Sequence, residues 1–478
     1  MIHNVNLDLQ SFRLIQLLYG RKSLWVLSCF LFVMSSTFAQ FSSNVNDSIV
    51  ITIEKLNSSV NSNFDDYAPI ISANEEELYF TSKRPQTEKE IKKQKESSEA
   101  IYHSTWNSEK GTWKQAVKLR DPLNSEGRNN SNIGISNDGQ QILIYKDDVT
   151  GNGNIFISYK NGVEWSVPVS IGESINSEYH ESSATIAPDG RTIYFVSDRP
   201  EGSGGRDIWM SKKNFDNTWS SPKNLGQLIN TKENEEAVFI HPDGKTLFFS
   251  SNGREGIGGY DIYYSTFNDG NWVKPVALAE PINTINNDLF FVLGASKKLG
   301  YYSTNSGSHN LFSINFEKIV LTNEAEPMES SDGLILLQGR ILDMETGQPL
   351  EARIELYNSH TSEKIAEFFS NSSTGEYLIS LPGGVTYAIN INKERYLFHS
   401  EHFTIKETSG FEKITKDYRL SEVKKGAKIV LNNVFFESSK SSLTDESKVE
   451  LDHIVVVLNQ YPGVKVEISG HTDSRGGH

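Results

Sequence analysis

Short apolar runs separated by glycine-rich turns recur along the first two thirds of the chain. Residues 187–197 (APDGRTIYFVS) match residues 241–251 (HPDGKTLFFSS), and residues 204–209 (GGRDIW) match residues 258–263 (GGYDIY) at the same offset of 54 residues. Weaker copies lie on either side, at residues 78–113, 136–165 and 300–312. Five copies at a spacing of about 50 residues indicate a protein built from structural repeats.

Each copy predicts four short strands joined by turns. The Pro-Asp-Gly segments suit a tight turn, because proline fixes φ, aspartate bonds the backbone and glycine tolerates positive φ. The aromatic and β-branched run that follows predicts a buried strand. Asp-Ile-Trp or Asp-Ile-Tyr starts a third strand, and a tryptophan followed by a proline, as at Trp219 and Pro222, marks the fourth. Such repeats predict a β-propeller with five blades, or with six if one degenerate copy is missed.

The ends of the repeat region predict how the ring closes. The last copy ends after Phe316 without a fourth strand, whereas residues 49–56 (IVITIEKL) provide a spare strand ahead of the first copy. We expect this spare strand to complete the last blade, which would leave no open edge. On these motifs residues 45–318 resemble the TolB-type propeller family, and we place the propeller domain at residues 40–320. The resemblance implies a module that binds proteins or other ligands.

A second all-β domain is predicted at residues 333–420, after a polar and acidic linker (321–332). Strand-like runs occur at residues 335–342, 353–357, 364–369, 376–381 and 386–391. Several short strands with regular turns predict a β-sandwich. Residues 339–350 (GRILDMETGQPL) and 374–384 (TGEYLISLPGG) resemble the carboxypeptidase regulatory-like domain family. This resemblance implies a rigid spacer or adhesion module without catalytic residues.

A short linker (421–427) leads to residues 428–478, which predict a strand, a helix and a second strand. Leu451, Ile454, Val455 and Leu458 follow the spacing of one helical face. The segment NVFF at residues 433–436 and the segment GHTD at residues 470–473 resemble the OmpA-like peptidoglycan-binding domain. The expected fold is therefore mainly β and multidomain: a propeller, then a β-sandwich, then a truncated α/β OmpA-like domain.

The OmpA-like resemblance implies a ligand site at the end of the second predicted strand. Asp473 is implied to bind the diaminopimelate of the peptidoglycan stem peptide, with Thr472 and His471 beside it, and a carboxylate suits a stem ammonium group. In the alternative, His471 and Asp473 only brace a loop. The family carries a second helix with a ligand-clamping arginine after this motif. The sequence stops at His478, so we expect it to be a fragment of a longer protein.

The N-terminal residues predict export from the cytoplasm. Basic residues, including Arg13 and Arg21, precede an apolar run at residues 24–34, and small and polar residues follow as far as Ala39. This order is typical of a signal peptide cleaved after Ala39. The run is shorter than the roughly 20 residues that span a bilayer, and an uncleaved anchor is the alternative. A lipoprotein attached through Cys29, the only cysteine in the sequence, is a further alternative.

The composition and the motifs limit the chemistry that the chain can perform. Its net charge of −15 argues against nucleic acid as a partner. Without Cys29 the exported chain has no thiol for catalysis or for zinc. We also find no Gly-x-Ser-x-Gly motif, and His180-Glu181 lacks the second histidine of a zinc helix. We interpret the repeated glycine loops and turn aspartates as architectural, and we expect neither a cofactor nor a metal.

Three arginines form one candidate site in the propeller. Arg84 and Arg199 share a repeat position, and Arg254 lies one residue away from it. Together they could form an anion site near one end of the propeller, as in a sialidase-like enzyme. The alternative is that each arginine is solvated or paired locally.

Together these features predict a non-enzymatic scaffold of the cell envelope on the periplasmic side of the outer membrane. It would hold peptidoglycan through the OmpA-like segment and an envelope protein through the propeller. The domain order resembles envelope proteins of the Bacteroidetes type, including a component of the type IX secretion machinery. Two alternatives remain open: a propeller enzyme acting on glycans or peptides, and a surface adhesin.

Overall fold

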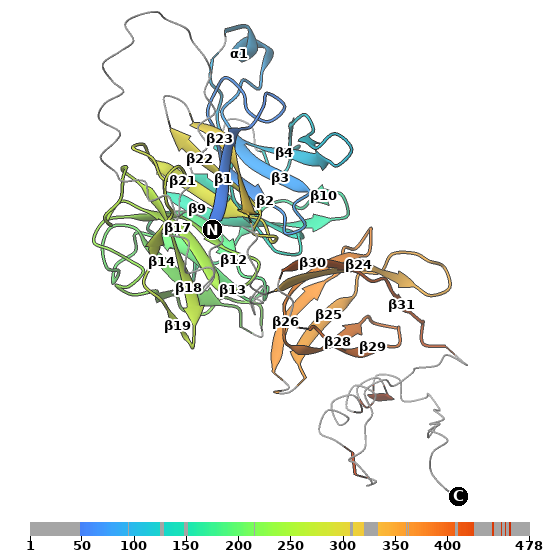
Figure 1. The fold of residues 1–478 in the computed structure, drawn as a ribbon. Coiled ribbons are helices and arrows are strands. Elements are labelled where there is room, and N and C mark those ends of the chain that lie inside the picture. The colour runs from blue at the N-terminus through green and yellow to red at the C-terminus, as the bar shows by residue number, and fades with distance from the viewer. Residues whose placement is uncertain are drawn as a thin grey trace, which may run out of the picture.

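The computed structural model describes residues 48–424 with short gaps, and six isolated residues beyond them. The gaps are residues 94, 125–128, 148–151, 215, 306–308, 320–332, 360, 362 and 407–409, and the isolated residues are 442, 443, 451, 455, 458 and 459. The described chain is almost entirely β-structure, with a short helix, α1 (Glu88–Lys93), between two strands (Figure 1). Within this part of the chain no helix is both long and apolar enough to cross a membrane.

Residues 48–319 form five antiparallel sheets. The first contains β2 (Asp66–Ile71), β3 (Glu77–Ser82), β4 (Ala100–Asn107), β5 (Thr112–Trp113) and β6 (Val117–Lys118). The second contains β7 (Ser131–Ile135), β8 (Gln141–Asp147), β9 (Gly153–Asn161), β10 (Glu164–Trp165) and β11 (Val169–Ser170). The third contains β12 (Glu181–Ile186), β13 (Thr192–Ser197), β14 (Asp207–Lys212) and β15 (Lys223–Asn224).

The fourth and fifth sheets follow the same order. The fourth contains β16 (Glu235–Ile240), β17 (Thr246–Ser251), β18 (Asp261–Asn268), β19 (Asn271–Trp272) and β20 (Val276–Ala277). The fifth contains β21 (Asp288–Leu293), β22 (Leu299–Asn305), β23 (His309–Ile319) and, from the N-terminal end, β1 (Ser48–Lys55). The first strands contact one another in the closed order β2, β7, β12, β16, β21 and back to β2. The arrangement is therefore propeller-like, with the sheets set around a central axis.

The second strand of each repeat is apolar without alternation because sheets pack on both of its faces. All six residues of β13 are buried, as are all six of β17. Phe195 packs toward the second sheet with Leu143, while its neighbour Val196 packs toward the fourth sheet with Phe249. A strand that is buried on both faces has a continuous apolar run in its sequence. The run at residues 192–197 is therefore explained by the neighbouring sheets that cover both faces of β13.

The ring closes by the pairing that the sequence predicts. Strand β1 lies antiparallel to β23 over its whole length, from Ser48 opposite Ile319 to Lys55 opposite Phe312. The fifth sheet thus takes its outer strand from the start of the chain. This pairing satisfies backbone groups that an open edge would expose.

A repeated asparagine fastens each sheet to the start of the next. Asn230 accepts a hydrogen bond from the backbone N–H of Ile208 (2.8 Å) and donates to the carbonyl oxygen of the same residue (3.0 Å). The equivalent asparagines bond to the third strands of the other sheets in the same way; they are Asn61, Asn124, Asn176 and Asn283. Asn61 bonds to Leu311 of the fifth sheet and so reinforces the closure.

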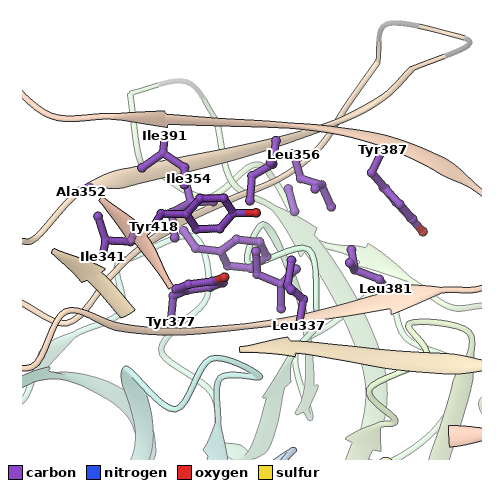
Figure 2. Close-up of a cluster of buried hydrophobic side chains, with 14 of the residues drawn as sticks. Leu337, Ile341, Ala352, Ile354, Leu356, Tyr377, Leu381, Tyr387, Ile391 and Tyr418 are labelled. Atoms are coloured by element: carbon purple, nitrogen blue, oxygen red, sulfur yellow. The ribbon is translucent and has the colours of Figure 1, made fainter. Parts of the chain in front are cut away.

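Residues 333–424 contain a sandwich of two further sheets. One contains β24 (Leu334–Asp343), β27 (Glu376–Pro382), β30 (Phe411–Thr415) and β31 (Tyr418–Leu420). The other contains β25 (Arg353–Asn358), β26 (Lys364–Phe369), β28 (Thr386–Asn392) and β29 (His399–Thr404). Figure 2 shows the shared core, in which Tyr377 and Tyr418 lie among aliphatic side chains such as Ile354 and Leu356. The sequence did not predict β29, β30 and β31.

Strand β24 explains how the sandwich joins the ring. Ile335 and Leu337 point into the sandwich core, whereas Leu334 and Leu336 pack against Ala73 and Ala295 of the ring. Four consecutive apolar residues therefore serve two different cores. This strand therefore joins the sandwich to the ring (Figure 1).

Candidate functional site

The ring has two ends, which differ in what covers them. We call the end with the turns between first and second strands the hairpin end; its turns lie at residues 72–77, 136–141, 187–192, 241–246 and 294–299. We call the opposite end, where the first strands begin, the loop end. Neighbouring first strands run in the same direction. The evidence is that Ser183 on β12 accepts a hydrogen bond from the backbone of Val238 on β16, and that two residues further along both strands Thr185 accepts one from Ile240.

The sandwich covers the hairpin end. Ser380 donates a hydrogen bond to Asn137 (2.9 Å), and Asn371 donates to Gln140 (2.8 Å). Ser372 donates to Asn161 at 2.6 Å. These polar contacts accompany the apolar contact of Leu334 and Leu336 with the ring, and a specific interface commonly combines an apolar centre with polar contacts at its rim.

A second set of contacts lies over the first sheet. The ammonium group of Lys413 donates to the carbonyl oxygen of Asn74 (2.7 Å) and lies 3.8 Å from the carboxylate of Glu76. The sandwich thus reaches at least two sheets with side-chain hydrogen bonds, and this fixes its orientation on the ring.

The turn aspartates at the hairpin end hold the turns, as their sequence context indicated. Asp189 accepts hydrogen bonds from the backbone of Arg191 and Thr192 and from the Thr192 hydroxyl (2.7–2.8 Å). Asp243 does the same with Lys245 and Thr246. The following glycines have positive φ, for example 66° at Gly190, which a glycine adopts without strain.

Asp243 has two additional neighbours, one histidine and one lysine. His241 lies 3.1 Å from its carboxylate, and Lys297 from the fifth sheet lies at the same distance. Burial on its own would raise the pKa of Asp243, but His241, Lys297 and the backbone donors hold that pKa well below its ordinary value. The carboxylate therefore stays ionised and ties the fourth sheet to the fifth.

A cavity runs along the axis of the ring. All five first strands line it, and it contains about 720 Å³ of empty space, part of it open to solvent. Its lining is mostly aliphatic and aromatic, with a few hydroxyl and amide groups such as Ser183 and Asn132. Ala73 and Ala295, which line its hairpin end, are the residues that Leu334 and Leu336 cover. The cavity therefore ends against the sandwich on that side.

Arg84 and Arg199 are each bound within their own sheet. Arg84 donates to Asp66 (2.7 Å) and to Ser82 (2.7 Å), and its guanidinium group stacks on Tyr102 at 4.4 Å from the ring centroid. Arg199 repeats the pattern with Glu181 (3.1 Å) and Ser197 (3.1 Å). Both acids are fully buried. The structure places the two arginines on the loop end but gives each its own carboxylate.

Arg254 departs from this pattern. Its sheet supplies the same elements, but Arg254 donates only to the carbonyl oxygens of Leu228 (2.8 Å) and Ile229 (2.7 Å). Glu235, the acid equivalent to Glu181, keeps the two hydroxyl donors of that position, Thr231 and Ser251, but receives no hydrogen bond from the arginine. The Nε of Arg254 is buried and has no partner among the described residues. The three arginines are thus spread over separate sheets, and one of them keeps unused donors.

The loop end also contains an acidic cluster beside the first sheet. The hydroxyl group of Tyr67 lies near Glu99, and Lys83 lies at 4.0 Å from the Glu99 carboxylate. Burial raises the pKa of Glu99, and the nearby charges of Asp147 and Asp65 raise it further, against the opposing effects of Tyr67 and Lys83. Among the residues that the structure describes, no group of three or more His, Cys, Asp or Glu could hold a metal ion.

Sequence reasoning missed the hydrogen bonds that the repeated asparagines make and the lack of a carboxylate partner at Arg254. The signal for the first was available, since Asn followed by Ser or Thr recurs ahead of each first strand. The signal for the second is one extra residue: Ser251-Asn252-Gly253-Arg254 replaces Ser197-Asp198-Arg199. The peptidoglycan residues His471, Thr472 and Asp473 lie outside the described residues.

Comparisons with known proteins give partial likenesses. No family model matches the sequence. Over 62 residues, which are 12% of this chain, it is 39% identical to "Probable lipoprotein YiaD" of Escherichia coli (strain K12), and the match spans 28% of that relative.

Solved structures with a partial likeness to this chain include two whose titles name TolB and one of a glycosidase. The TolB of Agrobacterium tumefaciens has a TM-score of 0.34 and 14% identity over 70% of this chain and 98% of its own. The TolB of Acinetobacter baumannii has a TM-score of 0.34 and 18% identity over 54% and 55% of the two chains. The α-L-arabinofuranosidase of Podospora anserina has a TM-score of 0.35 and 12% identity over 55% and 96%. These scores are too low to assign a function.

Proposed function

We propose that this chain is a non-enzymatic scaffold of the cell envelope with a wall-binding end and a partner-binding end. The ring is a five-bladed propeller of the TolB type that binds an envelope protein. The sandwich is a rigid spacer, and residues 428–478 are an OmpA-like segment that binds peptidoglycan through Asp473, with Thr472 and His471 beside it. The signal peptide at residues 1–39 directs export to the periplasm.

The observation that carries this proposal is the attachment of the sandwich to the hairpin end. A flexible linker would let the two modules tumble, whereas the double-sided strand β24 and the polar rim around it favour one body. The sandwich occupies one end of the ring and leads into the C-terminal segment. A partner is therefore expected at the other end, which this geometry leaves accessible.

The absence of a catalytic role is part of the proposal. Arg84 and Arg199 are occupied by Asp66 and Glu181, so little of their hydrogen-bonding capacity remains for an anionic substrate. An enzyme of the sialidase kind would need such arginines free to bind its substrate. A scaffold needs only a stable ring with an accessible face.

The wall-binding part is tested by sedimentation with purified sacculi. The full chain should pellet with the sacculi, and Asp473→Ala should weaken the affinity by about tenfold, the effect of losing one charge-assisted contact of about 1.4 kcal/mol. Asp269→Ala, at an exposed tip of the fourth sheet, is the control and should leave binding unchanged. Equal binding by both variants would contradict the assigned site, and no binding by the unaltered chain would contradict the wall-binding role.

A further inference from the structure

The repeats offer an internal comparison that marks one part of the loop end. Five copies of one fold show which residue types the architecture requires at each position. Where one copy departs from the others at an exposed position, the fold does not explain the departure. Such departures gather around the loop at residues 252–260 in the fourth sheet.

Three exposed aliphatic residues lie at this place. Leu228, Ile257 and Ile285 have 47%, 44% and 83% of their surface exposed. Leu228 lies two residues before the repeated asparagine Asn230. At this position the other copies have Ser59, Pro122, Ser174 and Pro281. Ile285 stands two residues after the next asparagine, where the other copies have Asn63, Glu126, Glu178 and Lys232. Ile257 replaces Ser203 of the otherwise matching glycine loop.

Backbone contacts bring the three residues to one area. On one side of the loop, Asn252 donates its backbone N–H to the carbonyl oxygen of Asn234, in the segment that follows Leu228. On the other side, Gly259 donates to the carbonyl oxygen of Asn286, next to Ile285. A Cβ atom at Gly258 would collide with the carbonyl oxygens of residues 284 and 286, so the glycine permits this close packing. The loop with Ile257 therefore lies between the loops with Leu228 and Ile285.

Arg254 lies in the same loop and supplies a charge. It is held against the backbone of Leu228 but has no carboxylate of its own, unlike Arg84 and Arg199. The buried Glu235 is near enough to attract it electrostatically, but forms no ion pair with it among the described residues. Its Nη2 is held by the carbonyl oxygens of Leu228 and Ile229, and its Nε is buried, so Nη1 is the group left to meet a partner. A guanidinium N–H forms a strong, charge-assisted hydrogen bond with a carboxylate.

We propose that Leu228, Ile257 and Ile285, together with Arg254, form a docking patch for a protein segment in which a carboxylate is flanked by aliphatic side chains. The carboxylate pairs with Arg254, and the aliphatic groups lie on the three exposed residues. This assignment rests on the proposed function, since it names the surface by which the ring would bind its partner. A membrane is a poor occupant, because the chain carries a net charge of −15 and the patch adds a single arginine.

The repeats also supply variants that keep the fold. Ile257→Ser introduces the residue of the third-sheet loop, Ile285→Lys introduces the residue of the preceding copy, and Leu228→Ser introduces the residue found at position 174. Each replaces an exposed side chain by one that the same architecture already accommodates. Their thermal midpoints should therefore stay within about 2 °C of the unaltered chain.

The test is photocrosslinking of the full chain in cells that produce it, with a benzophenone amino acid at position 257 and, as a matched control, at position 203. We expect an adduct from position 257 to a second protein, with a sequenced contact peptide that contains Asp, Glu or a C-terminal carboxylate beside aliphatic residues. Its yield should fall about tenfold in Arg254→Gln and in Ile285→Lys, as for a residue central to an interface.

Several results would overturn the assignment. An adduct from position 203 or from the hairpin end, with none from position 257, would keep a protein partner but reject this patch. An adduct to a second copy of this chain, a contact peptide without a carboxylate, or a yield unaffected by Arg254→Gln would also reject it. No adduct from any exposed position of the ring would reject the partner-binding function as well.

Discussion

The two ends of the ring differ in where their polar groups find hydrogen-bond partners. At the hairpin end, polar groups such as Asn137 and Gln140 are satisfied by another domain. At the loop end, the third sheet pairs its own arginine, since Arg199 lies against the carboxylate of Glu181. The fourth sheet has nearly the same sequence, but its Arg254 is displaced by one residue and donates to two backbone carbonyl oxygens instead of to a carboxylate. The comparison teaches that a shift of one residue between two nearly identical repeats changes which groups their arginines bind.

The largest effect is expected from breaking the self-contained pairing of the loop end. Glu181→Ala removes a fully buried carboxylate and leaves Arg199 without its charge partner in a largely buried position. Loss of one partner of such a pair costs about 3–5 kcal/mol, to be measured by urea unfolding. Arg254→Gln is the control and should cost less than about 1 kcal/mol, because Arg254 forms no ion pair whose loss would leave a buried carboxylate without a partner. Equal losses in the two variants would contradict the difference between the sheets.

A smaller effect is expected where the sandwich covers the hairpin end. Leu336→Ala removes a completely buried side chain from the contact with Ala73 and Ala295. Truncation of a buried leucine costs about 2–5 kcal/mol when the site cannot collapse, and the lower part of that range is expected at an interface between two modules. Calorimetry should then resolve separate transitions for the ring and the sandwich. An unchanged single transition would show that this contact does not couple them.

The hairpin end should also make stability depend on pH in the acidic range. Because the pKa of Asp243 is lowered in the folded state, its contribution is fully present above the ordinary aspartate pKa and is lost as pH falls through the lower, folded value. Asp243→Asn should therefore be less stable than the unaltered chain at pH 7, and the difference should shrink toward low pH. Urea midpoints between pH 3 and pH 7 measure this, and a constant difference would contradict it.

At the loop end, urea midpoints between pH 3 and pH 7 should show a carboxyl group whose effect on stability changes with pH in the opposite direction. Burial raises the pKa of Glu235 despite the hydrogen bonds from Thr231 and Ser251. A raised carboxyl pKa means that stability is lost as pH rises from the ordinary glutamate pKa through the folded value. Glu235→Gln should remove that loss, so its stability should vary less with pH than that of the unaltered chain.

The smallest effect is expected for the rim of the interface. Lys413 is partly exposed, and Glu76 more so, so Lys413→Ala should cost no more than about 1 kcal/mol. The measured loss should diminish in high salt, which screens an exposed ion pair. A loss as large as that of Leu336→Ala would place the energy of the interface in its rim.

The repeats made the ring predictable, and long-range contacts made the rest unpredictable. Pro-Asp-Gly turns and Asp-Ile-Trp strand starts fix local hairpins, and the spare strand at residues 49–56 indicated the closure. Strands such as β29 (HSEHFT) carry little apolar pattern and were missed. The contacts of Asn371 with Gln140 and of Ser380 with Asn137 join residues more than 200 positions apart, and no local pattern signals them. The four apolar residues at 334–337 were the one hint of a second buried face.

The most direct test of the account is whether the sandwich covers the hairpin end in solution. A zero-length carbodiimide joins an amine to a carboxylate only when they touch, and Lys413 lies 3.8 Å from Glu76 across the interface. Lys424 and Glu345, which pair on the exposed surface of the sandwich, are a built-in control. Coupling of both pairs within one chain is the predicted result in mass spectra of the digested protein. Coupling of Lys424 to Glu345 without any coupling of Lys413 to Glu76 would contradict the account.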